Sequence, residues 1–269
     1  MNIPRALATI AIAVACNMAA LAQQQPSGYH LVVCLKVNPG KNASYRRWWD
    51  EEGRKLVQAE VDSGQVSTYY RLRAVAPSGS SATCDVVGVW FYPGMPPEPL
   101  GKDTEALVRK AGITGSLEDF AARRDAVRTV VSSQIFQNQV ALGSIKKGDY
   151  VTVSYMKTAH IGEWLNMEKT VWQPIADALI KAGVESAWSV NLLILPNGDD
   201  LPYQGVTVDA YSNLAAAVKA QTPDASFDAL FRKAHPGMDE DATLQKAMGT
   251  RTQSMVYLFQ VEDVLTSTK

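Results

Sequence analysis

The sequence is poor in cysteine and histidine, with three residues of each among 269. The spacings H-x3-H, C-x2-C and H-E-x-x-H do not occur in it, and this argues against a zinc ion held by protein ligands. The G-x-S-x-G, Walker and strand-following G-x-G-x-x-G motifs are also missing, which argues against a serine hydrolase elbow, an NTPase and a dinucleotide fold. We therefore predict no metal site.

Neither sign of charge dominates, since 26 Lys and Arg stand against 27 Asp and Glu. A nucleic-acid-binding protein usually carries a basic surface, so nucleic acid is not an expected partner. Long apolar runs are also scarce. The run ALATIAIAVACNMAALA follows the positive start MNIPR, is too short for a comfortable membrane span, and ends in an A-x-A cleavage site. We predict a signal peptide over residues 1–22 and a disordered tether over residues 23–28.

The leader predicts a bacterial protein that is exported to the periplasm or secreted. A second reading stays open, because AVAC ending at Cys16 resembles a weak lipobox with Ala13 at the position that prefers Leu. In that case the chain would be a lipoprotein, and the membrane would be a partner only through the lipid on Cys16.

Two stretches of the chain repeat each other at a constant spacing of 119 positions. VAPSGSSATCDVVGVWFY (Val75–Tyr92) and ILPNGDDLPYQGVTVDAY (Ile194–Tyr211) share Pro, Gly, Val and Tyr at matching places. Upstream, YHLVVCLKV matches YVTVSYMKT, and near the end of each copy RTVVSSQIFQNQVAL matches RTQSMVYLFQVEDVL. The chain therefore contains a duplication. We predict two units, unit 1 over residues 29–146 and unit 2 over residues 147–265.

The periodicities in each unit predict the order β-α-β-β-α-β, the ferredoxin-like split arrangement. Each four-stranded antiparallel sheet would carry helices on one face only, and its other face has to be covered. We expect an α+β fold in which two tandem ferredoxin-like units pack their antiparallel sheets together into a pseudo-dimeric α/β barrel.

This element order and the duplication resemble the tandem dimeric α/β-barrel superfamily. It includes antibiotic-biosynthesis monooxygenases, EthD-like and NIPSNAP-like proteins, haem-binding chlorite dismutases and dye-decolourising peroxidases. The resemblance covers nearly the whole chain after the leader and is nearest to exported bacterial members with W-x3-E-x3-W-like helices. It implies a pocket between sheet and helices in each unit, but no single reaction, because the fold hosts many.

Two cysteines remain after the predicted cleavage, an even number for an oxidising compartment. Under the repeat, Cys34 and Cys84 take the places of Tyr155 and Tyr203, on strands that should be antiparallel neighbours. We predict a disulfide between them. The alternative is two buried thiols that act as small hydrophobic side chains.

Trp164, Glu168 and Trp172 lie four residues apart on one face of a predicted helix. A carboxylate between two indoles would be desolvated, which raises its pKa toward that of a usable general base. Arg128 and Arg251, which precede the last strand of each unit, could hold an anionic or carbonyl-bearing ligand. The alternatives are a helix that packs its aromatics on the sheet with Glu168 in solvent, and arginines with structural partners.

The candidate site residues fall into two groups. Glu168 and Arg251 are the candidate catalytic residues. The candidate ligand-binding residues are Trp164, Trp172, Trp188, Tyr155, Tyr203 and Arg128.

We expect the protein to bind a small, mostly apolar molecule in an aromatic-lined pocket, without a cofactor, and self-association into a homo-oligomer stays open. A second hypothesis is a cofactor-independent oxygenase or isomerase, in which Glu168 abstracts a proton and Arg251 stabilises the developing anion. The third is a haem protein of the chlorite-dismutase kind, with His160 or His235 as the axial ligand.

Overall fold

The structure is a computed structural model and describes residues 28–96, 103–198, 200–222 and 225–267. The predicted signal peptide and nearly all of the predicted tether lie outside these residues. Unit 1 contains β1 (Tyr29–Val37), α1 (Asn42–Trp48), η1 (Trp49–Gly53), α2 (Arg54–Asp62), β2 (Thr68–Ala76), η2 (Gly79–Ser81), β3 (Val86–Phe91), α3 (Asp103–Lys110), α4 (Leu117–Asp125) and β4 (Arg128–Gly143). Unit 2, whose last strand runs one residue past the predicted bound, contains β5 (Tyr150–Lys157), α5 (Ile161–Met167), η3 (Glu168–Trp172), α6 (Gln173–Lys181), β6 (Ala187–Leu195), β7 (Gly205–Tyr211), α7 (Leu214–Lys219), α8 (Ala225–Ala234), α9 (Glu240–Gly249) and β8 (Thr252–Thr266). None of the described helices is long and apolar enough to cross a membrane.

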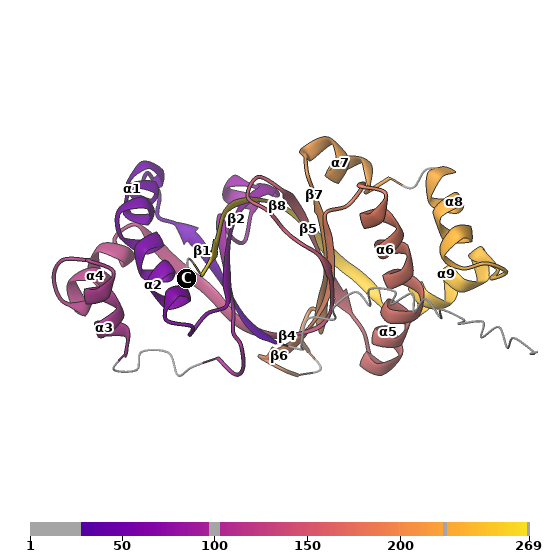
Figure 1. The fold of residues 1–269 in the computed structure, drawn as a ribbon, viewed down its shortest axis with the longest axis horizontal. Helices are drawn as coiled ribbons and strands as arrows, with labels where there is room; N and C mark the ends of the chain where they lie inside the picture. The colour runs from indigo at the N-terminus through magenta and orange to yellow at the C-terminus, as the bar shows by residue number, and fades with distance from the viewer. Residues whose placement is uncertain (1–27, 97–102, 199, 223–224, 268–269) are drawn as a thin grey trace, which may run out of the picture.

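The eight strands form one closed antiparallel barrel in the order β1-β3-β2-β8-β5-β7-β6-β4. Helices α1 to α4 lie outside the barrel on one side, and helices α5 to α9 lie outside it on the other (Figure 1). Successive side chains of a strand point to opposite faces, so each strand contributes one row to the barrel interior and one row to the helix layer.

The expected fold class, two separate sheets that pack against each other, is wrong. The units are joined by hydrogen bonds at both edges, because β2 pairs with β8 and β4 pairs with β6. A lone four-stranded sheet would leave two rows of unpaired backbone N–H and C=O groups, and closure into a barrel pairs them. The result is a single sheet with helices on its outer face.

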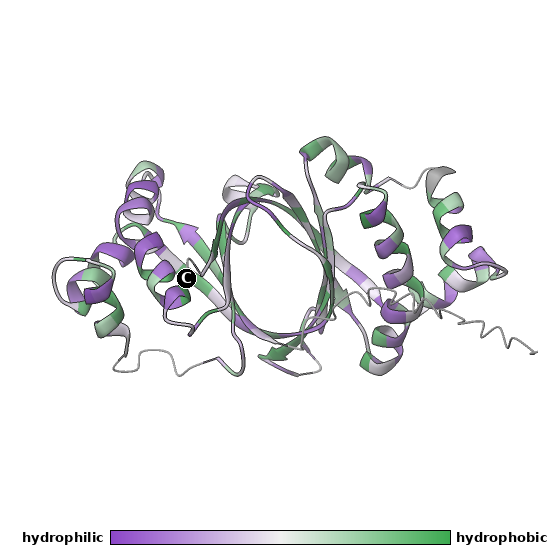
Figure 2. Cartoon of the chain, viewed as in Figure 1, coloured by the Kyte–Doolittle hydropathy of each residue, from purple (hydrophilic) through white to green (hydrophobic). Residues whose placement is uncertain are grey.

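Hydrophobic side chains gather in three regions. One lies inside the barrel and includes Leu72, Val151 and Phe259. The other two lie between the sheet and the helices, around Trp49 in unit 1 and Trp164 in unit 2. In Figure 2 the strands show green together with white and purple segments, and the outer helices alternate green with purple, as expected for helices with one buried face.

The first long helix of each unit contains a π-helical turn at the same place in the repeat. The turn covers Trp49–Gly53 in unit 1 and Glu168–Trp172 in unit 2, at the 119-residue spacing of the duplication. Such turns are rare in proteins, and those that occur often lie at functional sites. In unit 2 the turn begins with Glu168, the candidate base.

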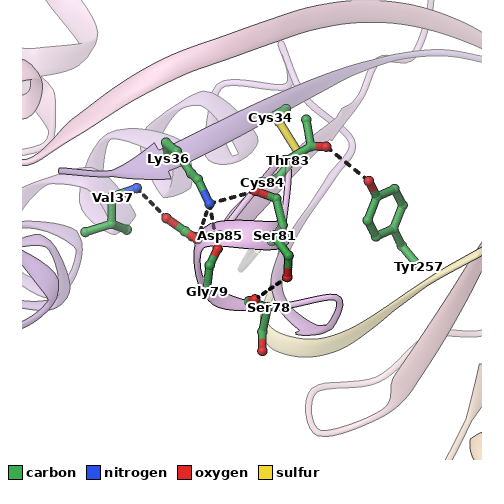
Figure 3. Close-up of polar contacts among 11 residues, drawn as sticks. Cys34, Lys36, Val37, Ser78, Gly79, Ser81, Thr83, Cys84, Asp85 and Tyr257 are labelled. Carbon is green, nitrogen blue, oxygen red and sulfur yellow. Dashed lines mark hydrogen bonds and ion pairs between the residues drawn. A yellow bond between two sulfur atoms is a disulfide. The ribbon is translucent and has the colours of Figure 1, made fainter. Parts of the chain in front are cut away.

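The predicted disulfide between Cys34 and Cys84 is confirmed, with the two Cα atoms 5.3 Å apart (Figure 3). The two cysteines are not paired residues of the sheet, because Cys34 lies opposite Val87 and Cys84 comes just before β3. The bond therefore fastens β1 to the segment that enters β3.

The segment before β3 is also held by Lys36. Its Nζ donates to the carbonyls of Gly79 and Ala82 at 3.0 and 2.7 Å and pairs with Asp85 Oδ1 at 3.0 Å. The other oxygen of Asp85 accepts the backbone N–H of Val37 at 2.9 Å (Figure 3). The disulfide and this lysine thus act on the same short segment.

We predict that the double variant Cys34→Ala/Cys84→Ala will lower the free energy of unfolding by about 2–4 kcal/mol, because the bond closes a long loop and restricts the unfolded chain. Denaturant unfolding at equilibrium measures this. The wild-type protein under reducing conditions should match the variant, and an unchanged midpoint in both would contradict the prediction.

Candidate functional site

Helices α5 and α6 run on through the π-helical turn, and this places Trp164 and Glu168 one turn apart. The indole Nε1 of Trp164 donates to Glu168 Oε1 at 2.7 Å. Trp164 is fully buried, and Gly205 makes room for it, since a Cβ at that position would overlap the indole ring. The orientation of the Glu168 carboxyl group is therefore held by a hydrogen bond from a fully buried side chain.

Glu168 also pairs with Arg251, the residue just before β8. Nη1 of Arg251 lies 2.9 Å from Glu168 Oε1, and the two side chains are 12% and 1% exposed. The guanidinium also lies over the ring of Trp172, 5.3 Å from its centroid. Burial raises the pKa of Glu168, while Arg251 and the Trp164 indole act in the opposite direction. The structure thus brings together Glu168, Arg251, Trp164 and Trp172.

A cavity of about 490 Å³ lies between the outer face of the unit 2 sheet and helices α6, α7 and α8. We call it the outer cavity. Glu168, Arg251, Trp172 and Trp188 line it, together with apolar residues of α6 and α8. Trp164 lies behind it. The outer cavity therefore combines aromatic walls with one buried ion pair.

Two further carboxyl groups line the outer cavity, those of Asp209 and Glu185. Asp209 lies on β7 opposite Trp188, and Glu185 lies just before β6. The pKa of Asp209 is raised by burial and by the nearby Glu168, although Thr152 and Arg251 oppose the shift. The pKa of Glu185 is raised by burial and by Asp209. Sequence reasoning missed both residues, and the available signal was an acidic residue inside the apolar strand GVTVDAY.

Tyr155 and Tyr203 lie away from the outer cavity. Their rings contact each other with centroids 4.6 Å apart, and Tyr203 donates to Gln134 Oε1 at 2.9 Å. Tyr155 lines a smaller cavity of about 100 Å³ inside the barrel, whereas its neighbours Ser154 and Met156 line the outer cavity. The alternation of side chains along β5 places these groups on opposite faces of one sheet.

Arg128 lies in unit 1, over the ring of Trp48 at 5.4 Å from its centroid. In the described part of the chain no carboxylate forms an ion pair with Arg128, and burial lowers its pKa. The counterpart of Glu168 in unit 1 is Trp49, which packs against Tyr69 and donates to Asp263 Oδ2 at 2.9 Å. Among the described residues, Arg128 therefore has no counterpart of the Glu168–Arg251 pair. The buried arginine that pairs with a carboxylate beside Trp49 is Arg71, whose Nη1 lies 2.6 Å from Glu262 Oε2.

The outer cavity does not fit a haem with a histidine ligand. Among the described residues that line it there is no histidine and no cysteine. His160 is exposed before α5, and His235 is buried with its Nε2 2.9 Å from the carbonyl of Val171. His30 lines the smaller cavity inside the barrel. The side chains in place thus offer no proximal histidine for a haem in the outer cavity.

We predict that Arg251→Met will lower the free energy of unfolding by about 3 kcal/mol at pH 8, because the buried Glu168 carboxylate loses its cation. The loss should shrink at pH 5. An unpaired buried carboxyl has a folded-state pKa above its unfolded value, so the variant loses stability as pH rises through that range. Urea unfolding at both pH values measures this.

Two controls accompany this prediction. Arg128→Met, which removes a cation without a paired carboxylate, should lose less stability, with little dependence on pH. Glu168→Gln added to Arg251→Met should reduce the pH dependence to the part that Asp209 contributes. Equal losses for Arg251→Met at both pH values would contradict the assigned ion pair.

Comparison with solved structures places the fold. A candidate monooxygenase from Lactobacillus acidophilus NCFM superposes with a TM-score of 0.54 at 11% identity, over 89% of this chain and 96% of that one. A candidate monooxygenase from Fusobacterium nucleatum gives 0.53 at 8% identity, over 89% and 94%. A haem-binding protein from Thermus thermophilus gives 0.50 at 11% identity, over 89% and 93%. No family model matches the chain, and no curated protein does. At these identities the likeness concerns the fold alone, and it confirms the resemblance to dimeric α/β-barrel proteins.

Proposed function

We propose that the outer cavity of unit 2 binds a small organic molecule with an apolar body. The observation that carries this is the cavity of about 490 Å³ with Trp172, Trp188 and Phe227 in its walls and a buried ion pair on its surface. Binding sites for small molecules are typically concave, largely apolar and equipped with a few fixed polar groups. The Glu168–Arg251 pair would orient the ligand, and the aromatic walls would hold its body.

Trp172 supports this assignment further. Its indole Nε1 is buried and has no hydrogen-bond partner among the described residues. A buried donor without a partner costs free energy, and a ligand acceptor that reached it would remove that cost.

We also propose export, with residues 1–22 as the signal peptide. The Cys34–Cys84 disulfide supports this, because such bonds persist mainly in oxidising compartments.

We predict that Ala216→Trp will weaken binding of tryptophol, a neutral aromatic probe, at least about tenfold, as expected when an indole fills the ligand volume. Ala216 lies on α7 and lines the outer cavity. Its backbone N–H donates to Oδ1 of the helix cap Asn213 at 2.9 Å, and the substitution leaves that bond in place. Isothermal titration calorimetry measures the affinity.

Ala215→Trp is the matched control for this substitution. Ala215 is the preceding residue on α7, is exposed, and does not line the outer cavity. The Ala215→Trp variant should bind tryptophol with the same affinity as the wild-type protein. Equal affinities in all three proteins would refute the cavity as the binding site.

A second candidate function is enzymatic, with Glu168 as a general base. The specific observation is a carboxyl group whose pKa is raised by burial and that lines a cavity with an arginine beside it. Glu168 would take a proton from the carbon next to a ligand carbonyl, and Arg251 would stabilise the enolate oxygen.

We expect wild-type protein to accelerate exchange of the methylene protons of phenylacetone with D₂O, followed by NMR. Glu168→Gln should slow this exchange at least about 100-fold, since an amide cannot accept the proton. Tryptophol should still bind with an affinity within about twofold, because the isosteric amide keeps the cavity shape. Glu163→Gln, an exposed change on α5, is the control. Undiminished exchange in Glu168→Gln would exclude it as the base.

A further inference from the structure

The outer cavity contains more acidic groups than basic ones. Glu168, Asp209 and Glu185 line it, whereas Arg251 is the buried cation and Lys219 lies exposed on α7. Lys219 has an interaction of its own. Arg251 contacts Glu168 directly, so its charge is already paired. Among the described residues, Asp209 and Glu185 therefore face the cavity with no cation in contact in any ion pair.

The two remaining carboxyl groups are poorly satisfied. Asp209 Oδ2 accepts from the hydroxyl of Thr152 at 3.4 Å, and Glu185 Oε1 accepts from the hydroxyl of Tyr211 at 3.5 Å. Both bonds are at the long limit for a hydroxyl donor. Glu185 is 8% exposed, and its second oxygen is buried with no hydrogen-bond partner among the described residues. An unpaired buried oxygen on a cavity wall leaves an acceptor for a donor from outside the chain, a water or a ligand.

The duplication shows that this fold does not require acids at these places. At the spacing of 119, the unit 1 counterparts of Glu168, Glu185 and Asp209 are Trp49, Val66 and Trp90. Trp49 and Val66 are buried there, and Trp90 packs against the same core. Two indoles are thus replaced by smaller carboxylate side chains, which supplies volume to the outer cavity, and all three replacements supply its negative charge.

A metal ion is a poor occupant for these acids. Within the described residues there is no group of three His, Cys, Asp or Glu side chains placed to hold one. The walls are partly aromatic instead, with Trp188 on β6 opposite Asp209 and Tyr211 two residues beyond it on β7. Aromatic rings beside carboxylates suit an organic cation, because the ring faces attract positive charge and the body of the ligand covers apolar wall.

We propose that the outer cavity is specific for a protonated amine with an aromatic or otherwise apolar body, whose ammonium group lies between Glu185 and Asp209. This rests on the proposed binding function of the same cavity and names its ligand class. The ammonium would donate to the unpaired Glu185 oxygen and to Asp209, and the body would lie against Trp188 and Trp172. Burial raises the pKa of both carboxyl groups, and a neighbouring carboxyl adds to each shift, Glu168 for Asp209 and Asp209 for Glu185. An arriving cation should therefore cause these groups to release protons.

The test is calorimetric titration of the full-length mature protein with three indole probes at pH 7.5: tryptamine, tryptophol and indoleacetate. These differ in the charge of the side group, which is positive, neutral or negative. We expect tryptamine to bind at least about tenfold more tightly than tryptophol, as for one good charge-assisted hydrogen bond. Repeating the tryptamine titration in buffers of different ionisation enthalpy should reveal proton release.

Glu185→Gln and Asp209→Asn should each reduce the preference for tryptamine over tryptophol to about twofold or less, because an amide does not attract the ammonium group. Glu163→Gln, on the exposed face of α5, is the control and should keep the full preference. Thermal unfolding of each variant checks that it is folded. A preserved preference in both carboxyl variants would overturn the proposal.

The remaining outcomes separate this inference from the binding function itself. Equal affinities for tryptamine and tryptophol, both lost in Ala216→Trp, would leave the binding function standing and overturn the preference for amines. Tighter binding of indoleacetate would also overturn it and would assign recognition to Arg251. No binding of any probe would overturn both proposals.

Discussion

The two seams of the barrel, β2 with β8 and β4 with β6, are the constraint on which the rest of the structure depends. Each seam joins an edge strand of one unit to an edge strand of the other, so the barrel leaves no open sheet edge. Closure also fixes which side chains face inward. On β5, Tyr155 faces the barrel while Ser154 and Met156 face the helices. The outer cavity is therefore separated from the barrel interior by the sheet itself.

Each unit has an arginine at the same place in the repeat, but the two arginines have different partners. Arg128 and Arg251 both lie over an indole at similar distances, 5.4 Å from Trp48 and 5.3 Å from Trp172. The indoles do not correspond in the repeat, since Trp172 matches Gly53 and Trp48 matches Met167. The position of the arginine is thus set by the last strand of its unit, which Arg128 begins and Arg251 precedes, and each helix supplies an aromatic surface for it. Only in unit 2 does this arginine also contact a carboxylate among the described residues.

Local patterns in the sequence predicted part of this arrangement. The spacing of Trp164, Glu168 and Trp172 was enough to place them on one helix, and the repeated arginine was enough to bring Arg251 near them. The pairing of Cys34 with Cys84 was predicted from the matched tyrosines and the expected neighbouring strands. The structure explains why this worked, because Tyr155 and Tyr203 are in contact at the corresponding places. Tyr155 and Tyr203, however, were predicted to bind the same ligand as Trp164 and Trp172, although the two tyrosines lie on the other side of the sheet.

Closure of the barrel and the acidic wall of the outer cavity depend on contacts that no local pattern encodes. Pairing β4 with β6 joins segments from different units, and antiparallel edges of similar composition allow several partners. Asp209 and Glu185 are 24 positions apart and meet only because β6 and β7 are neighbours. Comparison of the two copies already shows that acids stand in unit 2 at the places of Trp90 and Val66. That difference predicts a functional site only once these positions are known to face a cavity.

The three buried acids of unit 2 lower the stability of the fold, and this indicates that they serve a function. A carboxyl group taken out of water without a cation loses stability or takes up a proton, and an apolar side chain at the same position avoids both. Unit 1 has the apolar solution at all three places, within the same helix–sheet frame and with the same π-helical turn. Packing alone would therefore favour Trp, Val and Trp in unit 2 as well. Retention of three acids around a cavity is the pattern expected where local stability has been given up for recognition or catalysis.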